Sequence, residues 1–177
     1  EKEKEKINVL VLIDDGKSEV IPDYRLKDKV AKDIIKMANS IDKKIFLEIM
    51  LLSELKESFF DGKYEILQII AMSATLYDPV EVLAALRIAE VHKTMSIKKF
   101  EHYIVSYAAA GSLFRGEKSN DIDVYVIVDD TDVKKMTRAE LKDKLRAIII
   151  KMGFDAQAIT GVKKSFHIQV YILTDFW

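Results

Sequence analysis

The sequence predicts an α+β protein, a small mixed sheet flanked by helices. Short β-branched and apolar runs are typical of buried strands, and they alternate with segments whose apolar residues recur every three or four positions, which is typical of amphipathic helices. Hydrophobic residues make up 49% of the 177 residues and charged residues 32%, a balance that favours a folded core over disorder. A strand–helix–strand segment also occurs twice in the chain.

Charge and cysteine content exclude several classes of protein. Twenty-eight Lys and Arg residues balance 29 Asp and Glu residues, so the basic excess needed for non-specific nucleic-acid binding is missing. The lack of cysteine excludes disulfides, thiolate zinc sites and cysteine nucleophiles. No apolar run approaches the roughly 20 residues of a membrane helix, and the start EKEKEK is unlike a signal peptide. We expect a cytoplasmic protein without a membrane partner, and the charge richness is a weak sign of a thermophile.

The first half of the chain predicts two strands and three helices. INVLVLI at 7–13 is rich in β-branched residues and ends at an Asp-Asp-Gly turn, which indicates a buried strand. Asp78 and Pro79 are a typical N-cap and first helical residue. The expected elements are strands at 7–13 and 45–52, and helices at 24–40, 64–74 and 79–92.

The second half predicts three strands and one helix. IDVYVIV at 122–128 indicates a strand, and Thr137 with Glu140 forms the pattern of a capping box at a helix start. The expected elements are strands at 100–110, 122–128 and 166–173, and a helix at 137–152.

A shift of 115 positions aligns two parts of the chain. Thirteen of the 31 residues in 7–37 are identical to those in 122–152, and after a short gap 48–54 lies over 169–175. The repeat predicts two incomplete units, 1–94 and 95–177. Either the chain is part of a longer tandem protein, or incomplete units complete each other, which would include a homo-oligomer.

The candidate functional residues lie at 110–124, where the expected strand at 100–110 is followed by the expected strand at 122–128. Asp121 and Asp123 open a strand, so their side chains project from the same face. Two carboxylates this close repel each other, and a divalent cation bound by oxygen atoms, Mg²⁺ or Mn²⁺, relieves the repulsion. Amides around Gly111 and Ser112 can cradle phosphate oxygens. The combination indicates phosphoryl or nucleotidyl transfer.

Each part of this segment also has a simpler interpretation. Gly-Ser is usually a turn, Asp-x-Asp is usually a solvated strand start, and Arg115 and Lys118 are bases at a loop tip that could neutralise a triphosphate or merely face solvent. The order strand, Gly-Ser, loop and Asp-x-Asp strand is much rarer by accident, which favours the functional interpretation.

The run from Gly111 through SLFRGE to Asp121 and Asp123 resembles the nucleotidyltransferase superfamily of DNA polymerase beta, especially its minimal nucleotidyltransferase members. The resemblance covers about the second half of the chain. It implies transfer of a nucleoside monophosphate from a nucleoside triphosphate to an acceptor, with two metal ions. Asp121 and Asp123 would be the catalytic metal ligands, and Gly111 and Ser112 would hold the triphosphate. No motif in the sequence shows whether the acceptor is a nucleic acid, a protein or a small molecule.

The chain departs from the family pattern at the third carboxylate. Gln169 or His167 stands on the last strand where an Asp or Glu is expected, while Glu48 of the first unit aligns with Gln169. The first unit therefore keeps a carboxylate but lacks the aspartate pair, and the second keeps the pair but lacks the third carboxylate. Degenerate copies, a composite site and a weakly active site all fit this pattern.

Two hypotheses of different class follow. The intact aspartate pair favours a Mg²⁺- or Mn²⁺-dependent nucleotidyltransferase. Gln169 favours an inactive module of the same fold that binds a nucleotide or a protein partner, because a neutral amide cannot act as a general base.

Overall fold

The protein is mixed α+β and divides into two compact units, Glu1–Tyr64 and Glu65–Trp177. This computed structural model describes residues 6–16, 24–111, 120–131, 133 and 135–176. The division falls 30 residues before the 94/95 boundary expected from the repeat, because the helix before that boundary and the helix that crosses it belong to the second unit. No helix in the described ranges combines the length and apolar character needed to cross a membrane.

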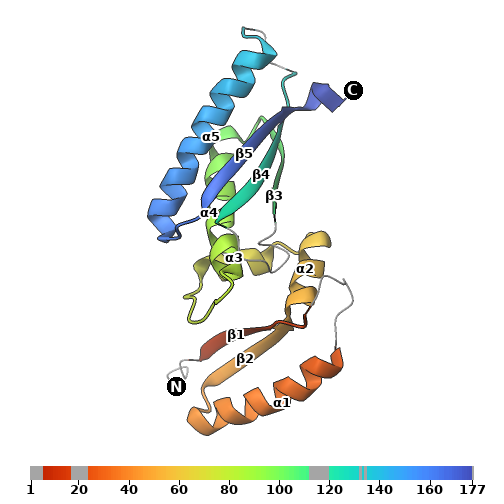
Figure 1. Ribbon diagram of the computed structural model, residues 1–177, viewed down its shortest axis with the longest axis vertical. Helices are drawn as coiled ribbons and strands as arrows, with labels where there is room; N and C mark the ends of the chain where they lie inside the picture. Colours follow the sequence, from red (N-terminus) through yellow and green to blue (C-terminus); the bar gives the residue numbers. More distant parts are fainter. Residues whose placement is uncertain (1–5, 17–23, 112–119, 132, 134, 177) are drawn as a thin grey trace, which may run out of the picture. The chain divides into compact units, whose positions relative to one another are not determined.

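The first unit contains a strand–helix–strand motif followed by a helix (Figure 1). The two strands pair in parallel, with Ile7 opposite Ile45 and Ile13 opposite Leu51. Both strands and the first helix agree with the sequence prediction to within one residue. The elements are β1 (Ile7–Ile13), α1 (Tyr24–Ile41), β2 (Ile45–Leu51) and α2 (Leu52–Phe60).

Helix α2 was not predicted, because its apolar residues continue those of β2 without a break. Leu51 ends the strand and is also the residue before the helix, and it offers no side-chain oxygen to cap it. The carboxylate of Glu54 accepts a hydrogen bond from the Leu51 amide instead, at 2.8 Å. This is half of a capping box, and a Glu three residues after a strand end is the signal that could have revealed the helix.

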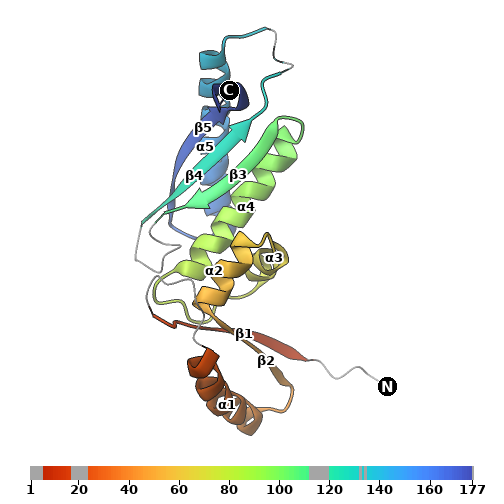
Figure 2. The ribbon, with the colours of Figure 1, turned by 90° about the vertical axis from the view of Figure 1, so that its right-hand side faces the viewer.

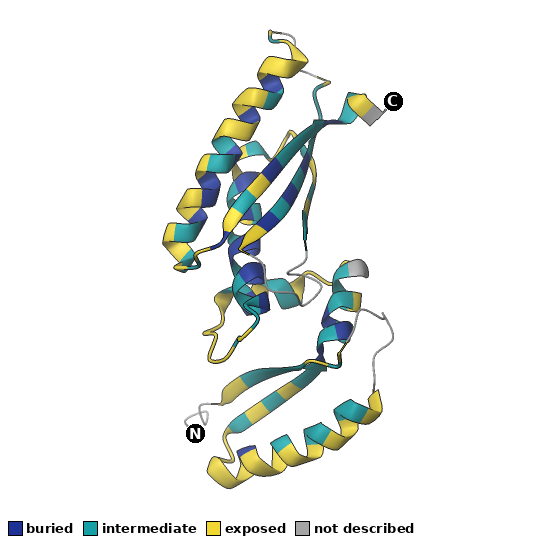
Figure 3. Cartoon of the chain, viewed as in Figure 1, coloured by how far each residue is buried: buried dark blue, intermediate teal, exposed yellow. Residues whose placement is uncertain are grey.

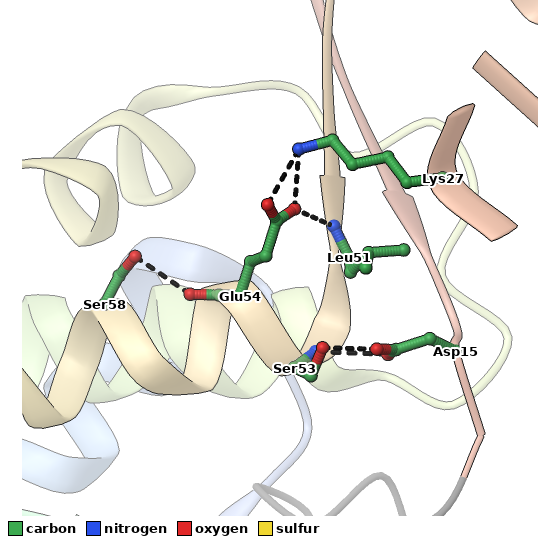
Figure 4. A network of polar contacts seen from close by, with 6 residues as sticks. All are labelled: Asp15, Lys27, Leu51, Ser53, Glu54 and Ser58. Atoms are coloured by element: carbon green, nitrogen blue, oxygen red, sulfur yellow. Dashed lines mark hydrogen bonds and ion pairs between the residues drawn. The ribbon is translucent and has the colours of Figure 1, made fainter. Parts of the chain in front are cut away.

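Side chains at the carboxyl ends of β1 and β2 form a polar network in the first unit (Figure 4). The Ser53 hydroxyl and amide both donate to Asp15, which follows β1. The Lys27 ammonium of α1 donates to both oxygens of Glu54, each at 2.8 Å. The two contacts tie the start of α2 to β1 and to α1, the two elements that precede β2 in the chain.

The second unit is a three-stranded sheet with helices. Its order is β3-β4-β5, with β3 antiparallel and β5 parallel to the central strand β4. Residues of both long helices share one core with the strands, so α4 and α5 cover the same face of the sheet (Figure 2). The elements are α3 (Glu65–Met72), α4 (Val82–Phe100), β3 (Ile104–Ala110), β4 (Asp121–Val128), α5 (Arg138–Thr160), β5 (Ser165–Ile172) and the short 3₁₀ helix η2 (Leu173–Phe176).

Two helices differ in extent from the sequence prediction. Helix α4 begins at Val82, three residues later than expected, and its N-cap is Glu81 in place of the predicted Asp78, whose carboxylate accepts hydrogen bonds from the amides of Val82 and Ala84. It ends at Phe100, eight residues later than expected, so the strand predicted from residue 100 begins only at Ile104. Helix α5 begins at its capping box as predicted, but runs eight residues further, to Thr160. Its end is set by Gly161, whose φ of 70° is left-handed and therefore favours glycine.

Contacts of the first unit recur at the aligned positions of the second. The hydroxyl of Thr174, which aligns with Ser53, donates to Asp130, with both carboxylate oxygens at 3.0 Å, and the Ser53 hydroxyl likewise donates to one oxygen of Asp15. Lys142 of α5 pairs with Asp175, as Lys27 pairs with Glu54. Both units thus fix the segment after a parallel strand through a hydroxyl–aspartate bond and an ion pair.

A neutral histidine lies in the core of the second unit. His92 is fully buried, and its Nε2 lies 2.9 Å from the Ile149 carbonyl, which can only accept, so Nε2 carries the proton. Its Nδ1 then accepts from the Tyr107 hydroxyl at 2.7 Å. Burial lowers the pKa of His92 and raises the pKa of Tyr107, so both groups stay neutral.

Helix α5 approaches β5 closely at Gly153. A Cβ at this position would lie 2.9 Å from Cδ2 of Phe166. The Phe166 ring cannot move away easily, because it stacks on the buried His92 ring with centroids 4.4 Å apart. The glycine is therefore required by helix–strand packing, and its backbone conformation is ordinary.

A buried lysine joins the loop before β5 to the start of α4. Lys164 is only 3% exposed, and its ammonium pairs with the Glu81 carboxylate. Glu81 has a left-handed φ of 63°, which is unusual for a residue other than glycine.

Gly153→Ala is expected to lower the free energy of unfolding by about 1–3 kcal/mol through overpacking. The loss should outweigh the roughly 1 kcal/mol by which alanine is preferred over glycine within a helix. Urea denaturation in two backgrounds separates the packing loss from the helix preference of alanine. In a Phe166→Leu background the clash is relieved, so Gly153→Ala should become neutral or stabilising. Equal effects in both backgrounds would contradict the packing explanation.

The stability of the second unit should depend on pH through His92. The pKa of His92 in the folded state is below 6.5, so on acidification the histidine is protonated in the unfolded chain before it is protonated in the folded protein. The neutral His92 therefore contributes fully to the free energy of unfolding above about pH 7.5, and this contribution is lost as the pH falls below about 6.5. His92→Gln should lower stability at about pH 8 by about 1–3 kcal/mol yet flatten its decline toward about pH 5. His102→Gln, at an exposed position, should keep the wild-type slope in the same denaturation series.

Candidate functional site

The last residues of β3 and the first residues of β4 and β5 lie at the same end of the sheet in the second unit. Because β3 is antiparallel to β4, its last residue, Ala110, lies opposite Asp123. Because β5 is parallel to β4, its beginning lies at the same end, with His167 opposite Asp123 on the other side. The end of β3 and the starts of β4 and β5 therefore lie at one end of the sheet (Figure 1). The register places the aspartate pair, His167 and the residue before Gly111 there.

The two aspartates lie on the face of β4 that points away from the helices. Ile122 and Val124, which alternate with them along the strand, are fully buried in the core. Asp121 is exposed, and the Asp123 side chain is 35% exposed. Figure 3 shows this alternation along β4. The predicted side-by-side arrangement of the carboxylates therefore has the required face and exposure.

Gly111 is positioned against Asp123. Its φ of 119° lies outside the region that residues with a side chain adopt, and a Cβ there would lie 3.3 Å from Oδ2 of Asp123. The glycine thus allows both the turn at the end of β3 and the approach of the backbone to the carboxylate. The approach of this backbone to a phosphate ligand, which the sequence predicted, stays a prediction.

His167 is the residue beside the aspartate pair on the last strand. Its Nδ1 lies 3.1 Å from Oδ1 of Asp123, and its side chain is 57% exposed. Gln169, the other candidate for the third position, pairs with Tyr125 two residues further along the sheet. The Gln169 amide oxygen accepts a hydrogen bond from the Tyr171 hydroxyl at 2.6 Å.

The structure does not place the remaining predicted site residues relative to this cluster. Ser112, Arg115 and Lys118 lie outside the described residues. Glu48 lies on β2 in the first compact unit, where it is exposed and pairs with Leu10.

Sequence reasoning missed the aromatic part of this face. Tyr125 of β4 and Tyr171 of β5 are partly exposed, and their rings stack with centroids 6.4 Å apart. They continue the row that begins with Asp123 and His167, on the side of the sheet away from α4 and α5. The alternation in IDVYVIV and FHIQVYI was the available signal, because it places the tyrosines on the same face as Asp123 and His167.

An open groove of about 690 Å³ lies next to the strand ends. Asn120, directly before the aspartate pair, and Ser165, at the start of β5, form one side of it, and the last turns of α5 form the other. Phe154 and Lys163 add an aromatic ring and a positive charge to its lining.

The donor set was compared with what a metal ion requires. Within the described ranges, no group of three or more His, Asp or Glu side chains is placed to hold a metal. The aspartate pair supplies two carboxylates, which suits Mg²⁺ or Mn²⁺ only if a ligand or solvent completes the coordination shell, as is usual for Mg²⁺ with phosphates. The residues fit a metal that is bound together with a phosphate ligand.

Comparison with protein-family models, curated proteins and solved structures finds no match for this chain.

Mn²⁺ or Mg²⁺ together with a nucleoside triphosphate should stabilise the protein against thermal unfolding, by about 2.7 kcal/mol at about 100 times the dissociation constant. Asp121→Asn with Asp123→Asn should remove this shift, because the amides are neutral and poor ligands for these ions. Asp143→Asn, at an exposed position on α5, is the matched control and should keep it. An equal shift in the double variant would show that the ligand binds elsewhere.

Proposed function

We propose that this chain is a metal-dependent nucleotidyltransferase that moves a nucleoside monophosphate from a nucleoside triphosphate to an acceptor. The observation that carries the proposal is the aspartate pair on the uncovered face at the start of β4, against the Gly111 turn. This is the arrangement that a carboxylate-bound metal and a closely approaching triphosphate require.

The proposed roles follow from the chemistry of each side chain. Asp121 and Asp123 would hold Mg²⁺ or Mn²⁺, which would offset the negative charge of the triphosphate. Gly111 would bring backbone amides close to the phosphates, and Ser112 would add to this cradle. Arg115 and Lys118 are proposed contacts of the triphosphate, because both are positively charged and lie between the two motifs in the sequence.

We assign His167 the part of the missing third carboxylate. If its Nδ1–H donates to Asp123 Oδ1, which lies at 3.1 Å, its Nε2 carries the lone pair and can accept a proton. The Asp123 carboxylate would orient the ring. The lone pair on Nε2 would then take the proton from an acceptor hydroxyl.

The groove at the start of β4 is a proposed acceptor position, although it is lined by α5 and by none of Gly111, Asp121, Asp123 and His167. It adjoins Asn120, one residue before the aspartate pair, and carries both an apolar ring and a lysine. Such a lining favours an acceptor with an apolar part and a negative charge, and it does not separate nucleic acid from protein or small molecule.

A second candidate function is that of an inactive module that binds a nucleotide or a protein partner. It is favoured by the absence of a third carboxylate beside the pair in the described part of the chain. The Gln169 amide oxygen accepts a hydrogen bond from the Tyr171 hydroxyl, and Gln169 pairs with Tyr125, two residues further along β4 than Asp123.

We infer that the two units are copies of one nucleotidyltransferase-like repeat. Support comes from the parallel strand–helix–strand order of both units and from the equivalent Ser53–Asp15 and Thr174–Asp130 bonds. The first copy lacks the aspartate pair and would have a structural role.

Incubation with labelled ATP, GTP, CTP or UTP, Mg²⁺ and a cell lysate tests the proposal by transfer of label. His167→Ala should lower the rate by about 10²- to 10⁴-fold, the usual contribution of a general base. His167→Asp should retain part of the activity, because it places a carboxylate beside the pair. His102→Ala, at an exposed turn position, is the matched control and should leave the rate unchanged.

The remaining variants separate the alternatives. Loss of activity in Glu48→Gln would indicate a composite site in place of His167. A rise in Gln169→Asp or Gln169→Glu would indicate that the missing carboxylate belongs two residues further along β5. No transfer by any variant, with every nucleotide, would leave the binding module as the function.

A further inference from the structure

The outer edge of β1 pairs with no other strand among the described residues. Strand β1 pairs with β2 alone among the described residues, whereas β4, with which β1 aligns in the repeat, pairs on both edges. A two-stranded sheet is seldom stable by itself, and three or more strands are usually needed. Part of the first unit is therefore an incomplete sheet.

Strand β1 lacks the charged residues and the proline that often protect an edge strand. Ile7–Ile13 contains no proline and no charged residue, whereas β2 carries the exposed Glu48 in its middle. Lysine, proline and inward charges are the usual means by which edge strands avoid pairing with other chains.

The backbone direction shows which residues of β1 present this edge. The Ile7 amide donates to the Lys44 carbonyl at 3.0 Å, so Ile7 and every second residue after it direct their polar backbone groups toward β2. The backbone groups of Asn8, Leu10 and Leu12 therefore point to the open edge.

We propose that a second copy of this chain occupies the edge, with the two β1 strands antiparallel about a twofold axis at Leu10. In this register Leu10 faces Leu10 of the second copy and Asn8 faces Leu12. All three outward residues then exchange backbone hydrogen bonds with the second copy, as in an antiparallel ladder. The result is a continuous four-stranded sheet in the order β2-β1-β1-β2.

The sequence of β1 is self-complementary in this register. INVLVLI reads almost the same in both directions, so that Ile7 lies opposite Ile13 and Val9 opposite Val11. The residues that flank the strand carry opposite charge, because Lys6 falls opposite Asp14 of the second copy, twice in each dimer. Both are exposed in the single chain. This charge complementarity favours a second copy over an unrelated strand.

Sedimentation equilibrium of the full chain, from about 1 to about 300 µM, tests the proposal. Wild type should show a monomer–dimer equilibrium. Leu10→Pro should be monomeric throughout, because proline removes the amide at the twofold axis and leaves the bonds to β2 intact. Circular dichroism would verify that this variant is folded.

Charge reversal gives a test that does not depend on proline. Lys6→Glu should weaken the dimer by about three- to tenfold, since two ion pairs become repulsive, and Lys6→Glu with Asp14→Lys should restore it. Lys43→Glu, the same charge change in the exposed turn before β2, is the matched control. A monomeric wild type would overturn the proposal and leave the edge to a strand of another protein. A dimer that is insensitive to both Leu10→Pro and Lys6→Glu would overturn it as well.

Discussion

The candidate site depends on the pairing of β4 along both of its edges. An antiparallel neighbour brings the end of β3 to the start of β4, and a parallel neighbour brings the start of β5 to the same place. If either neighbour ran in the other direction, Gly111 or His167 would lie at the far end of the sheet, about seven residues or roughly 23 Å away. Helices α4 and α5 both lie on the face of the sheet opposite to the aspartates.

The sequence was sufficient for most of the fold, because most elements carry a local signal. Thr137 and Glu140 located the start of α5, and INVLVLI and IDVYVIV located two strands. Helix α2 could not be predicted, because Leu51 and Leu52 are apolar on both sides of the change from strand to helix. The extent of α5 was also missed, since Gly153 within the helix resembles a terminator, and only contact with Phe166 explains it. The division into units follows long-range packing of α4, which no local pattern records.

The site was predicted in part, through motifs that are contiguous in the sequence. Gly111 and the aspartate pair came from such motifs, and their positions on the sheet follow from the alternation of a strand. The partner on β5 depended on the register between β4 and β5, which the sequence leaves open between His167 and Gln169. A displacement of two residues keeps every side chain on its face, so periodicity cannot distinguish the two. Hydrogen bonding distinguishes them, because His167 contacts Asp123 while Gln169 contacts Tyr171.

The ion pair between the buried Lys164 and the half-exposed Glu81 has a consequence at elevated temperature. Transfer of an ammonium group out of water is costly near 25 °C, and such a pair then adds little net stability and can reduce it. The hydration of ions becomes less favourable on heating, so this penalty falls while the attraction to Glu81 is retained. Lys164 is nearly inaccessible and joins the loop before β5 to the start of α4. Its contribution to holding these two segments together therefore increases as the protein is heated, in the range where loops otherwise begin to open.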